Sequence, residues 1–398
     1  MTVRHLALVL LFGSCLGEAA RSGEPERGPE PADTARIEAD VRWLAHPDRN
    51  GRAEAADREA VAAYLAARFE AVGLRPVPGR DGWFQDGAAG GGAARLRNVL
   101  GWLPPTASGI APEEPAHLLV LAGYDHLGRT TDGELLPGAN GNASGVAALL
   151  EVARRLASSE PSADGPRRCG ILFAALDLTE QGEQGARRYL AKPPLPLSDC
   201  RAVVELDMLG RSFGDLAPGL LMVIGTEHST ALRTLAAAMA PPAEGRLQLL
   251  SSTFHLISSN YTLFARQDMA CAYLTAGSSS DYHKPGDDVD RIDWVALGRR
   301  TAWAEGFLAR LAASAEPVDW HAEATVDLPE IRALRELCDV FRAQRGDSLP
   351  ALAQRLLQRL VDNLDAILAR GEVTAAEVTA LRTMMEAMMP LAQSMGGR

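Results

Sequence analysis

The stretch of sequence that decides the fold is residues 117–128, which read HLLVLAGYDHLG. A short apolar run, His117 to Ala122, passes directly into a loop of glycine and polar residues. Such a run predicts a fully buried strand. In a parallel sheet, the loops at the carboxyl ends of buried strands are where functional side chains gather. The stretch therefore predicts one strand of a parallel sheet with polar groups at its carboxyl end.

Similar apolar runs recur along the chain. The further candidate strands are Gly170 to Leu176, Ala202 to Leu206, Leu220 to Ile224 and Ala270 to Thr275. Amphipathic or apolar helical patterns occupy Ala55 to Val72, Ala143 to Ala157 and Leu232 to Met239. Alternation of strands and helices predicts an α/β fold, a mostly parallel central sheet flanked by helices.

Four further motifs lie at or near the ends of these runs. They are Gly138-Ala139-Asn140-Gly141-Asn142-Ala143-Ser144-Gly145, Thr179-Glu180-Gln181-Gly182, Leu206-Asp207-Met208-Leu209-Gly210 and Tyr282-His283-Lys284-Pro285-Gly286-Asp287. Together with Gly123-Tyr124-Asp125-His126-Leu127-Gly128, their order and spacing resembles the zinc-dependent aminopeptidase and glutaminyl cyclase family. The resemblance covers roughly residues 36 to 314, and five motifs in order are far more specific than one.

The resemblance implies a metallopeptidase fold and a two-zinc site. In that family a bridging Asp is shared by both ions; one ion also takes a Glu and a His, and the other a His and an Asp. Carried over residue by residue, the Glu ligand falls on Glu180, the Asp ligand on Asp207 and the late His ligand on His283. These three positions match the family pattern.

Other positions of the pattern are lost. The first His ligand falls on Gly123, the bridging Asp on Gly141 and the catalytic general base on Thr179. The family's Ser-Asp-His reads Ser259-Asn260-Tyr261 here. Asp125, which would orient the missing imidazole, is still present.

These losses predict a degenerate metal site. Glycine offers no side-chain ligand, and a catalytic zinc normally has three protein ligands. Loss of a general base alone typically lowers the rate about a hundred- to ten-thousand-fold. We therefore expect zinc to bind weakly or as a single ion at most. His126 is a candidate substitute ligand that would join Glu180, Asp207 and His283; the alternative is that it is an ordinary loop histidine.

The last part of the chain has a different pattern. Pro329 to Gly346, Leu349 to Gly371 and Thr374 to Met395 each predict a helix. Gly371 is a candidate carboxyl cap, and Thr374 with Glu377 forms a capping-box signature. The methionines of the last helix, Met384, Met385, Met388 and Met389, suit either an adaptable partner surface or packing within the protein. Because amphipathic stripes usually face a core, packing within the protein is the prediction.

The first residues predict export. Arg4 and His5 precede a short apolar run, Leu6 to Phe12, which is typical of a signal peptide over residues 1–20 and too short to span a bilayer. Phe12-Gly13-Ser14-Cys15 resembles a lipoprotein processing site with lipid on Cys15. The alternative is plain cleavage near Ala19 or Ala20, which leaves a secreted or periplasmic protein without an anchor. Residues 21–35 have the composition of a linker.

Composition limits the partners and the redox chemistry. A formal charge of −11 over 398 residues argues against nucleic acid or an anionic membrane as a main partner. A disulfide between Cys169 and Cys200 is conceivable in an exported protein, whereas buried free thiols are the alternative. Cys271 and Cys338 complete the set beside Cys15.

The predicted division is a metallo-aminopeptidase-like domain over residues 36–315 and a helical extension over residues 316–398. The leading functional hypothesis is an exported, catalytically degenerate homologue that binds a peptide or a protein. One alternative is an active metallo-aminopeptidase with an atypical mononuclear zinc site. Another is a structural protein that acts through its C-terminal helices.

Overall fold

The computed structural model describes residues 32–88, 95–110, 116–158, 165–217, 219–254, 259–323 and 326–393. The predicted signal peptide, Cys15 and residues 21–31 of the predicted linker lie outside these residues. Among the described helices, none combines the length and apolar character needed to cross a bilayer.

A sheet of eight strands forms the centre of the described part of the chain, in the order β1-β2-β4-β3-β5-β8-β6-β7. Its strands are β1 (Phe84–Ala88), β2 (Arg95–Leu103), β3 (His117–Gly123), β4 (Gly170–Leu176), β5 (Cys200–Asp207), β6 (Leu220–Ile224), β7 (Arg246–Leu250) and β8 (Cys271–Thr275). Strands β4, β3, β5 and β8 are parallel. At one side of the sheet, β2 is antiparallel to both of its neighbours, β1 and β4. At the other side, β6 and β7 are parallel to each other, and β6 is antiparallel to β8.

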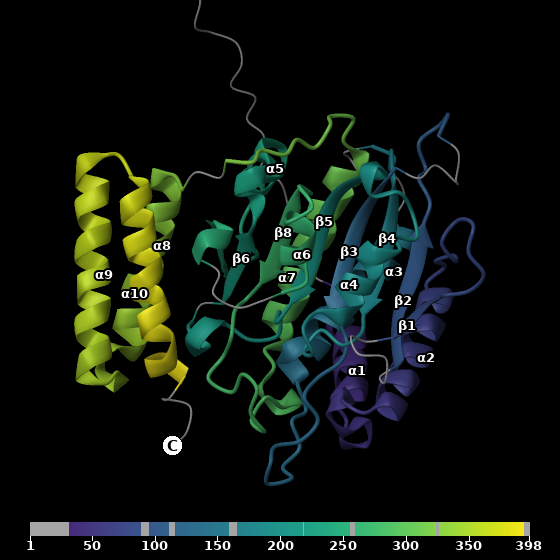
Figure 1. The fold of residues 1–398 in the computed structure, drawn as a ribbon, viewed down its shortest axis with the longest axis horizontal. Helices are drawn as coiled ribbons and strands as arrows, with labels where there is room; N and C mark the ends of the chain where they lie inside the picture. The colour runs from purple at the N-terminus through teal and green to yellow at the C-terminus, as the bar shows by residue number, and fades with distance from the viewer. Residues whose placement is uncertain are drawn as a thin grey trace, which may run out of the picture.

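Helices cover both faces of the sheet, which confirms the predicted α/β fold (Figure 1). The helices are α1 (Thr34–Leu44), α2 (Ala55–Ala71), α3 (Gly145–Ser158), α4 (Gln184–Ala191), α5 (Thr230–Ala238), α6 (Tyr261–Ala265), α7 (Trp294–Ala313), α8 (Leu328–Arg345), α9 (Ala351–Arg370) and α10 (Ala375–Gln393). Alternate residues of β3 serve the two faces. Leu118 and Val120 join the core with α1, α2, α3 and α7, whereas Leu119 and Leu121 join the core with α4 and α6.

The apolar runs predicted the buried strands closely. Strands β4 and β6 have the predicted bounds, and β3, β5 and β8 differ by one or two residues at an end. Strands β1, β2 and β7 were not predicted, because their sequences are polar or interrupted. Strand β2, for example, carries Arg95, Arg97 and Asn98 before its apolar end. Strands β1 and β7 are the two edges of the sheet and lack a continuous apolar run, whereas β2 lies inside the sheet and was missed because its first residues are polar.

The three C-terminal helices form a bundle beside the β6 end of the sheet (Figure 1). Ile331, Leu334 and Leu360 belong to the same apolar core as Leu220 and Met222 of β6, so the bundle packs on the sheet. The predicted caps are present. Gly371 ends α9 with a φ of 81°. The amide of Thr374 donates to Glu377, and the Glu377 amide is 3.4 Å from the Thr374 hydroxyl.

The four cysteines of the described residues are free thiols. Cys169 and Cys200, the pair considered for a disulfide, are therefore not joined. Burial raises the pKa of both thiols, that of Cys200 to about 12, so neither is a reactive thiolate at neutral pH.

Candidate functional site

The carboxyl ends of β3, β4, β5 and β8 lie along one edge of the sheet, as the parallel register requires. Glu180 lies in the loop after β4, Asp207 is the last residue of β5, and His283 lies in the loop after β8. The polar motifs therefore follow neighbouring strands at a common edge, where sites of α/β sheets are found.

Glu180 lies between two imidazoles. Its Oε1 is 3.6 Å from Nδ1 of His126 and 3.4 Å from Nε2 of His283. The two rings meet edge to face with centroids 5.7 Å apart, and Tyr282 stacks on His283. Burial alone would raise the pKa of Glu180, but the two imidazoles outweigh it and lower that pKa to about 2. Glu180 is therefore an ionised carboxylate at neutral pH.

His126 is turned inward, as its proposed role as a substitute ligand requires. Its residue is 2% exposed, and neither ring nitrogen has a hydrogen-bond partner. Burial lowers its pKa, which keeps the imidazole neutral. A neutral imidazole with free nitrogens has the electronic form of a metal ligand.

Asp207 has a different environment. It accepts a hydrogen bond from the hydroxyl of Tyr273 at 2.7 Å, and burial, followed by the nearby charge of Glu205, raises its pKa to about 8. Within the described residues, no group of three or more His, Cys, Asp or Glu side chains is arranged to hold a metal ion. The family's two-zinc centre therefore does not fit the side-chain arrangement that this chain presents.

Thr179 occupies the space that a side chain at position 123 would need. A Cβ on Gly123 would lie 2.5 Å from Oγ1 and 2.9 Å from Cβ of Thr179, closer than atoms can approach. Gly141 is different: a Cβ there would meet Asp287 at 3.6 Å and Met208 at 3.9 Å, which are ordinary contacts. Its φ of −112° also suits a residue with a side chain. Position 141 therefore accepts a Cβ without a clash, whereas position 123 does not.

Asp125 accepts hydrogen bonds from the amides of Thr179, at 2.7 Å, and Glu180, at 3.2 Å. It thus fixes the loop that presents Glu180, a contact the sequence did not reveal. Burial raises its pKa to about 7. The segment Ser259-Asn260-Tyr261, where the resemblance expects Ser-Asp-His, also has a definite role. Ser259, Asn260 and the amide of Tyr261 all donate to the buried carboxylate of Glu205.

Glu205 and Arg52 are site-supporting residues that the sequence analysis missed. Glu205 precedes Asp207 by two positions in an otherwise apolar strand, a signal that could have identified it. Arg52 is 1% exposed and donates to carbonyl oxygens of Leu44, Tyr124, Pro137 and Gly138. Arg52 carries no recognisable sequence signal.

The loop that carries Gly141 is held on both sides. Asp287 accepts from the amides of Asn140 and Gly141 at 2.9 and 3.0 Å. The Asn142 side chain donates to the carbonyl of Leu206 at 3.1 Å and accepts from the amide of Gly145 at 3.0 Å. Asn142 thus joins the start of α3 to the end of β5, as expected of a residue that serves a helix start.

The sequence and the fold of the chain were compared with those of known proteins. The sequence profile of peptidase family M28 matches residues 98–307. A glutaminyl cyclase from Bacteroides thetaiotaomicron, solved with bound N-acetylhistamine, is similar in fold, with 18% identity and a TM-score of 0.54 over 71% of this chain and 99% of that protein. A leucine aminopeptidase precursor from the same organism gives 18% identity and a TM-score of 0.54, over 70% and 97%.

A zinc-dependent exopeptidase from Parabacteroides distasonis gives 16% identity and a TM-score of 0.53, with 70% of this chain and 98% of that protein covered. No curated protein sequence matches. The solved structures support the fold, and the profile match extends over more than half of the chain. This chain therefore belongs to peptidase family M28.

Proposed function

We propose that this chain is an exported, catalytically degenerate member of peptidase family M28 that binds a peptide or a protein segment without hydrolysing it. The observation that carries the proposal is the packing of Thr179 into the space of a side chain at position 123. The residue that replaces the general base also blocks the position of a lost ligand. Restoring a two-zinc centre thus requires a change at both positions, in addition to a carboxylate at position 141.

Peptide binding is proposed from the groups that remain. Glu180 and His283 are partly exposed, at 24% and 32% of their side chains. Glu180 is ionised, so its carboxylate is suited to accept N–H groups from the amino terminus of a peptide. Such an edge would bind a peptide's terminal amine while lacking the metal-bound water that hydrolysis needs.

A second candidate function is a metallo-aminopeptidase with one zinc ion. The observation in its favour is the set of ring nitrogens near Glu180 that lack a hydrogen-bond partner: both on His126 and Nε2 on His283. Zinc would supply a Lewis acid at these groups.

Metal content and activity separate the two candidates. We expect less than about one zinc per chain after dialysis, because a catalytic zinc normally has three protein ligands. We also expect no release of amino acids from aminoacyl substrates in added zinc, manganese or cobalt. One tightly held zinc, lost in His126→Ala, together with turnover that is abolished by Glu180→Ala, would instead establish the mononuclear enzyme.

Peptide binding can be measured directly by calorimetry. A short peptide with a free amino terminus should bind, and the same peptide with an acetylated terminus is the matched control. Glu180→Gln should weaken binding of the peptide with the free amino terminus and leave binding of the acetylated peptide unchanged. Equal binding of both peptides would argue against capture of the amino terminus.

A further inference from the structure

Strands β6 and β7 run in the direction opposite to β8, so their carboxyl ends form a second edge of the sheet at which a ligand can bind. Strand β6, helix α5 and strand β7 form a parallel βαβ unit, and β6 is antiparallel to β8. The carboxyl ends of β6 and β7 therefore lie at the edge opposite to that of β3, β4, β5 and β8. Open α/β sheets bind ligands outside the carboxyl ends of their strands. Glu227 follows β6 at this edge, and Ser251 and Ser252 follow β7.

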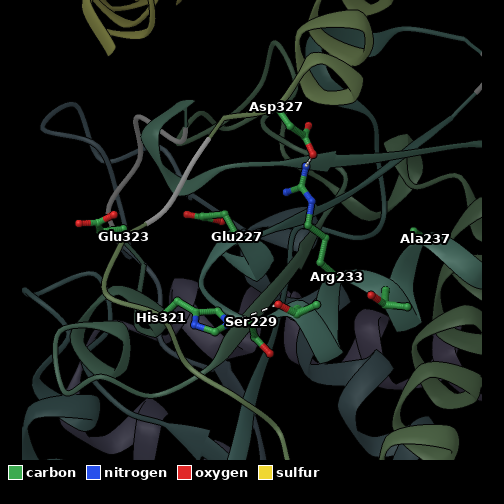
Figure 2. A pocket seen from close by; sticks show the side chains of 9 residues that line it. Glu227, Ser229, Arg233, Ala237, His321, Glu323 and Asp327 are labelled. Carbon is green, nitrogen blue, oxygen red and sulfur yellow. Dashed lines mark hydrogen bonds and ion pairs between the residues drawn. The ribbon is translucent and has the colours of Figure 1, made fainter. Parts of the chain in front are cut away.

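A cavity of about 420 Å³ lies at this edge. That volume is within the range of about 300–1,000 Å³ typical of small-molecule sites. In Figure 2, the Glu227 side chain lies between those of Glu323 and Arg233 in the view shown, and Arg233 is joined to Asp327. The cavity is separate from the peptidase-type site, since none of its lining residues belongs to that site.

Glu227 has an unused buried oxygen. Its side chain has no exposed surface, and its Oε1 accepts from the amide of Ser252 at 2.8 Å and from the Ser252 hydroxyl. Its Oε2 is buried and has no hydrogen-bond partner. A buried carboxylate oxygen without a donor is costly, which marks it as a place where a ligand or a water would be stabilised.

A second buried carboxyl group, that of Glu330, is bound at the same end of β7. The amide of Ser251 donates to Oε1 of Glu330, and Oε2 of Glu330 has no hydrogen-bond partner but lies 3.8 Å from Nη2 of Arg233. The one guanidinium among the cavity's lining residues, that of Arg233, is thus engaged with Asp327 at 2.8 Å and with Glu330. Burial raises the pKa of Glu330 to about 8, and the charges of Glu227 and Asp327 add to that rise.

The chemistry of the cavity excludes an anionic ligand. Helix α5 begins at the cavity, but its first amides are already occupied. Asp319 accepts from the amides of Thr230 at 3.0 Å and Ala231 at 2.9 Å, and Ser229 accepts from the amide of Leu232. The carboxylates that line the cavity, those of Glu227, Glu323 and Asp327, outnumber Arg233. The cavity therefore has one unsatisfied acceptor, Oε2 of Glu227, and a net negative charge.

We propose that this cavity binds a small organic cation, whose amine or guanidinium group donates to Oε2 of Glu227. The same head group could come from a free diamine or from a basic side chain of a peptide. The site is independent of the proposed peptide-binding function, because it lies at the opposite edge of the sheet.

Calorimetry with agmatine, which carries both an amine and a guanidinium, tests the proposal on the full-length mature protein. Glu227→Gln places an amide donor or a neutral oxygen where the cation would bind. It should weaken the affinity for agmatine at least about tenfold, as expected for loss of a charged hydrogen bond. Thr234→Arg adds a positive charge to an exposed lining residue without touching the buried carboxylates. It should also weaken binding, and it decides the matter if Glu227→Gln fails to fold.

A matched variant controls for charge. Glu244→Gln removes a carboxylate that is 79% exposed and should bind agmatine as the unmodified protein does. A lysine-containing peptide with an acetylated terminus distinguishes the peptide source from the free diamine. Absence of agmatine binding at about 10 mM, or unchanged binding in Thr234→Arg, would overturn the proposal.

Discussion

At the scale of single residues, Gly123 and Thr179, which stand where the family resemblance expects a ligand and a base, are coupled through packing. In the sequence, Gly123 and Thr179 are two separate departures from the family pattern. In the structure they are one, because Thr179 fills the volume that Gly123 leaves empty. A protein interior is close-packed, so a lost side chain is usually compensated by a neighbour. Gly141 has no such compensation, which leaves its position open to a side chain.

This coupling predicts the outcome of a double-mutant cycle. Gly123→Ala should destabilise the protein by about 1–3 kcal/mol, since the new methyl group overpacks against Thr179. In a Thr179→Gly background the same change should be better tolerated, which would appear as a positive coupling in urea unfolding. Gly141→Ala is the control and should have a smaller effect, given its contacts at 3.6 and 3.9 Å. Equal costs for Gly123→Ala in both backgrounds would show that Thr179 is not the obstacle.

Local motifs predicted which residues gather at the site but not how they are held. His126 and His283 do come together around the carboxylate of Glu180. The partners that orient the site are distant in sequence: Tyr273 on Asp207 and Asn260 on Glu205. A motif records spacing along the chain, whereas these hydrogen bonds depend on the order of strands in the sheet. The physical cause of the missed contacts is therefore their long range.

At the scale of elements, the link between the C-terminal helices and the sheet depends on a buried carboxylate. Glu330 lies in the first turn of α8, and its side chain has no exposed surface. Apolar periodicity predicted the helices of this region, since their stripes are regular. It could not predict where they dock, because β7, the strand that α8 approaches, has only two fully buried residues.

Glu330 makes stability depend on pH. Burial raises its pKa to about 8 in the folded chain, against about 4.3 for an unperturbed glutamate. The folded chain thus keeps a proton that the unfolded chain releases, so its contribution to stability is present below about pH 4 and is lost as pH rises through 8. The loss has a limit of about 1.4 kcal/mol per pH unit. Glu330→Gln should flatten the fall of the unfolding free energy between pH 5 and 8, measured in urea.

Glu244→Gln, at an exposed position, is the control for that measurement and should leave the slope unchanged. An identical slope in Glu330→Gln and the unmodified protein would show that Glu330 ionises normally in the folded state.

The C-terminal helices should unfold together with the sheet. Leu334 of α8 is 4% exposed and lies in the core shared with β6, so Leu334→Ala should lower the unfolding free energy by about 2–5 kcal/mol. Leu352 of α9 is 51% exposed, and Leu352→Ala should change it by less than about 0.5 kcal/mol. Calorimetry should show one transition that shifts as a whole. Two transitions, of which only the smaller responds to Leu334→Ala, would mean that residues 316–398 form an independent unit.

At the scale of the whole molecule, the destination of the chain depends on residues outside the described structure. We predict that export requires residues 1–20 and that Cys15 carries lipid after processing. The basic start and the short apolar run suit an export signal, and small residues precede the cysteine. Mass spectrometry of the mature N-terminus identifies the product. An unmodified terminus that begins after Ala19 or Ala20 would retain secretion and exclude the anchor.

Restoring the family's site should require several changes at once. Gly141→Asp has room for its Cβ and supplies the bridging carboxylate, but it leaves the second ion short of a ligand and the water without a base. Gly123→His alone is blocked by Thr179, so it should destabilise the protein without adding metal. The triple change Gly123→His, Gly141→Asp and Thr179→Glu replaces the blocking hydroxyl and methyl groups and rebuilds the lost groups around Glu180, Asp207 and His283.

Residues that act as a unit are strongly non-additive, so we expect zinc content and aminopeptidase activity to rise in the triple variant and in none of the single ones. The triple variant with Glu180→Ala is the control, because loss of that ligand should remove both gains. Zinc near two per chain without turnover would place the remaining defect in Asp207, which Tyr273 holds at 2.7 Å. Turnover by the unmodified protein, abolished by Glu180→Ala, would contradict the degenerate assignment, since it would show that the present side chains suffice for hydrolysis.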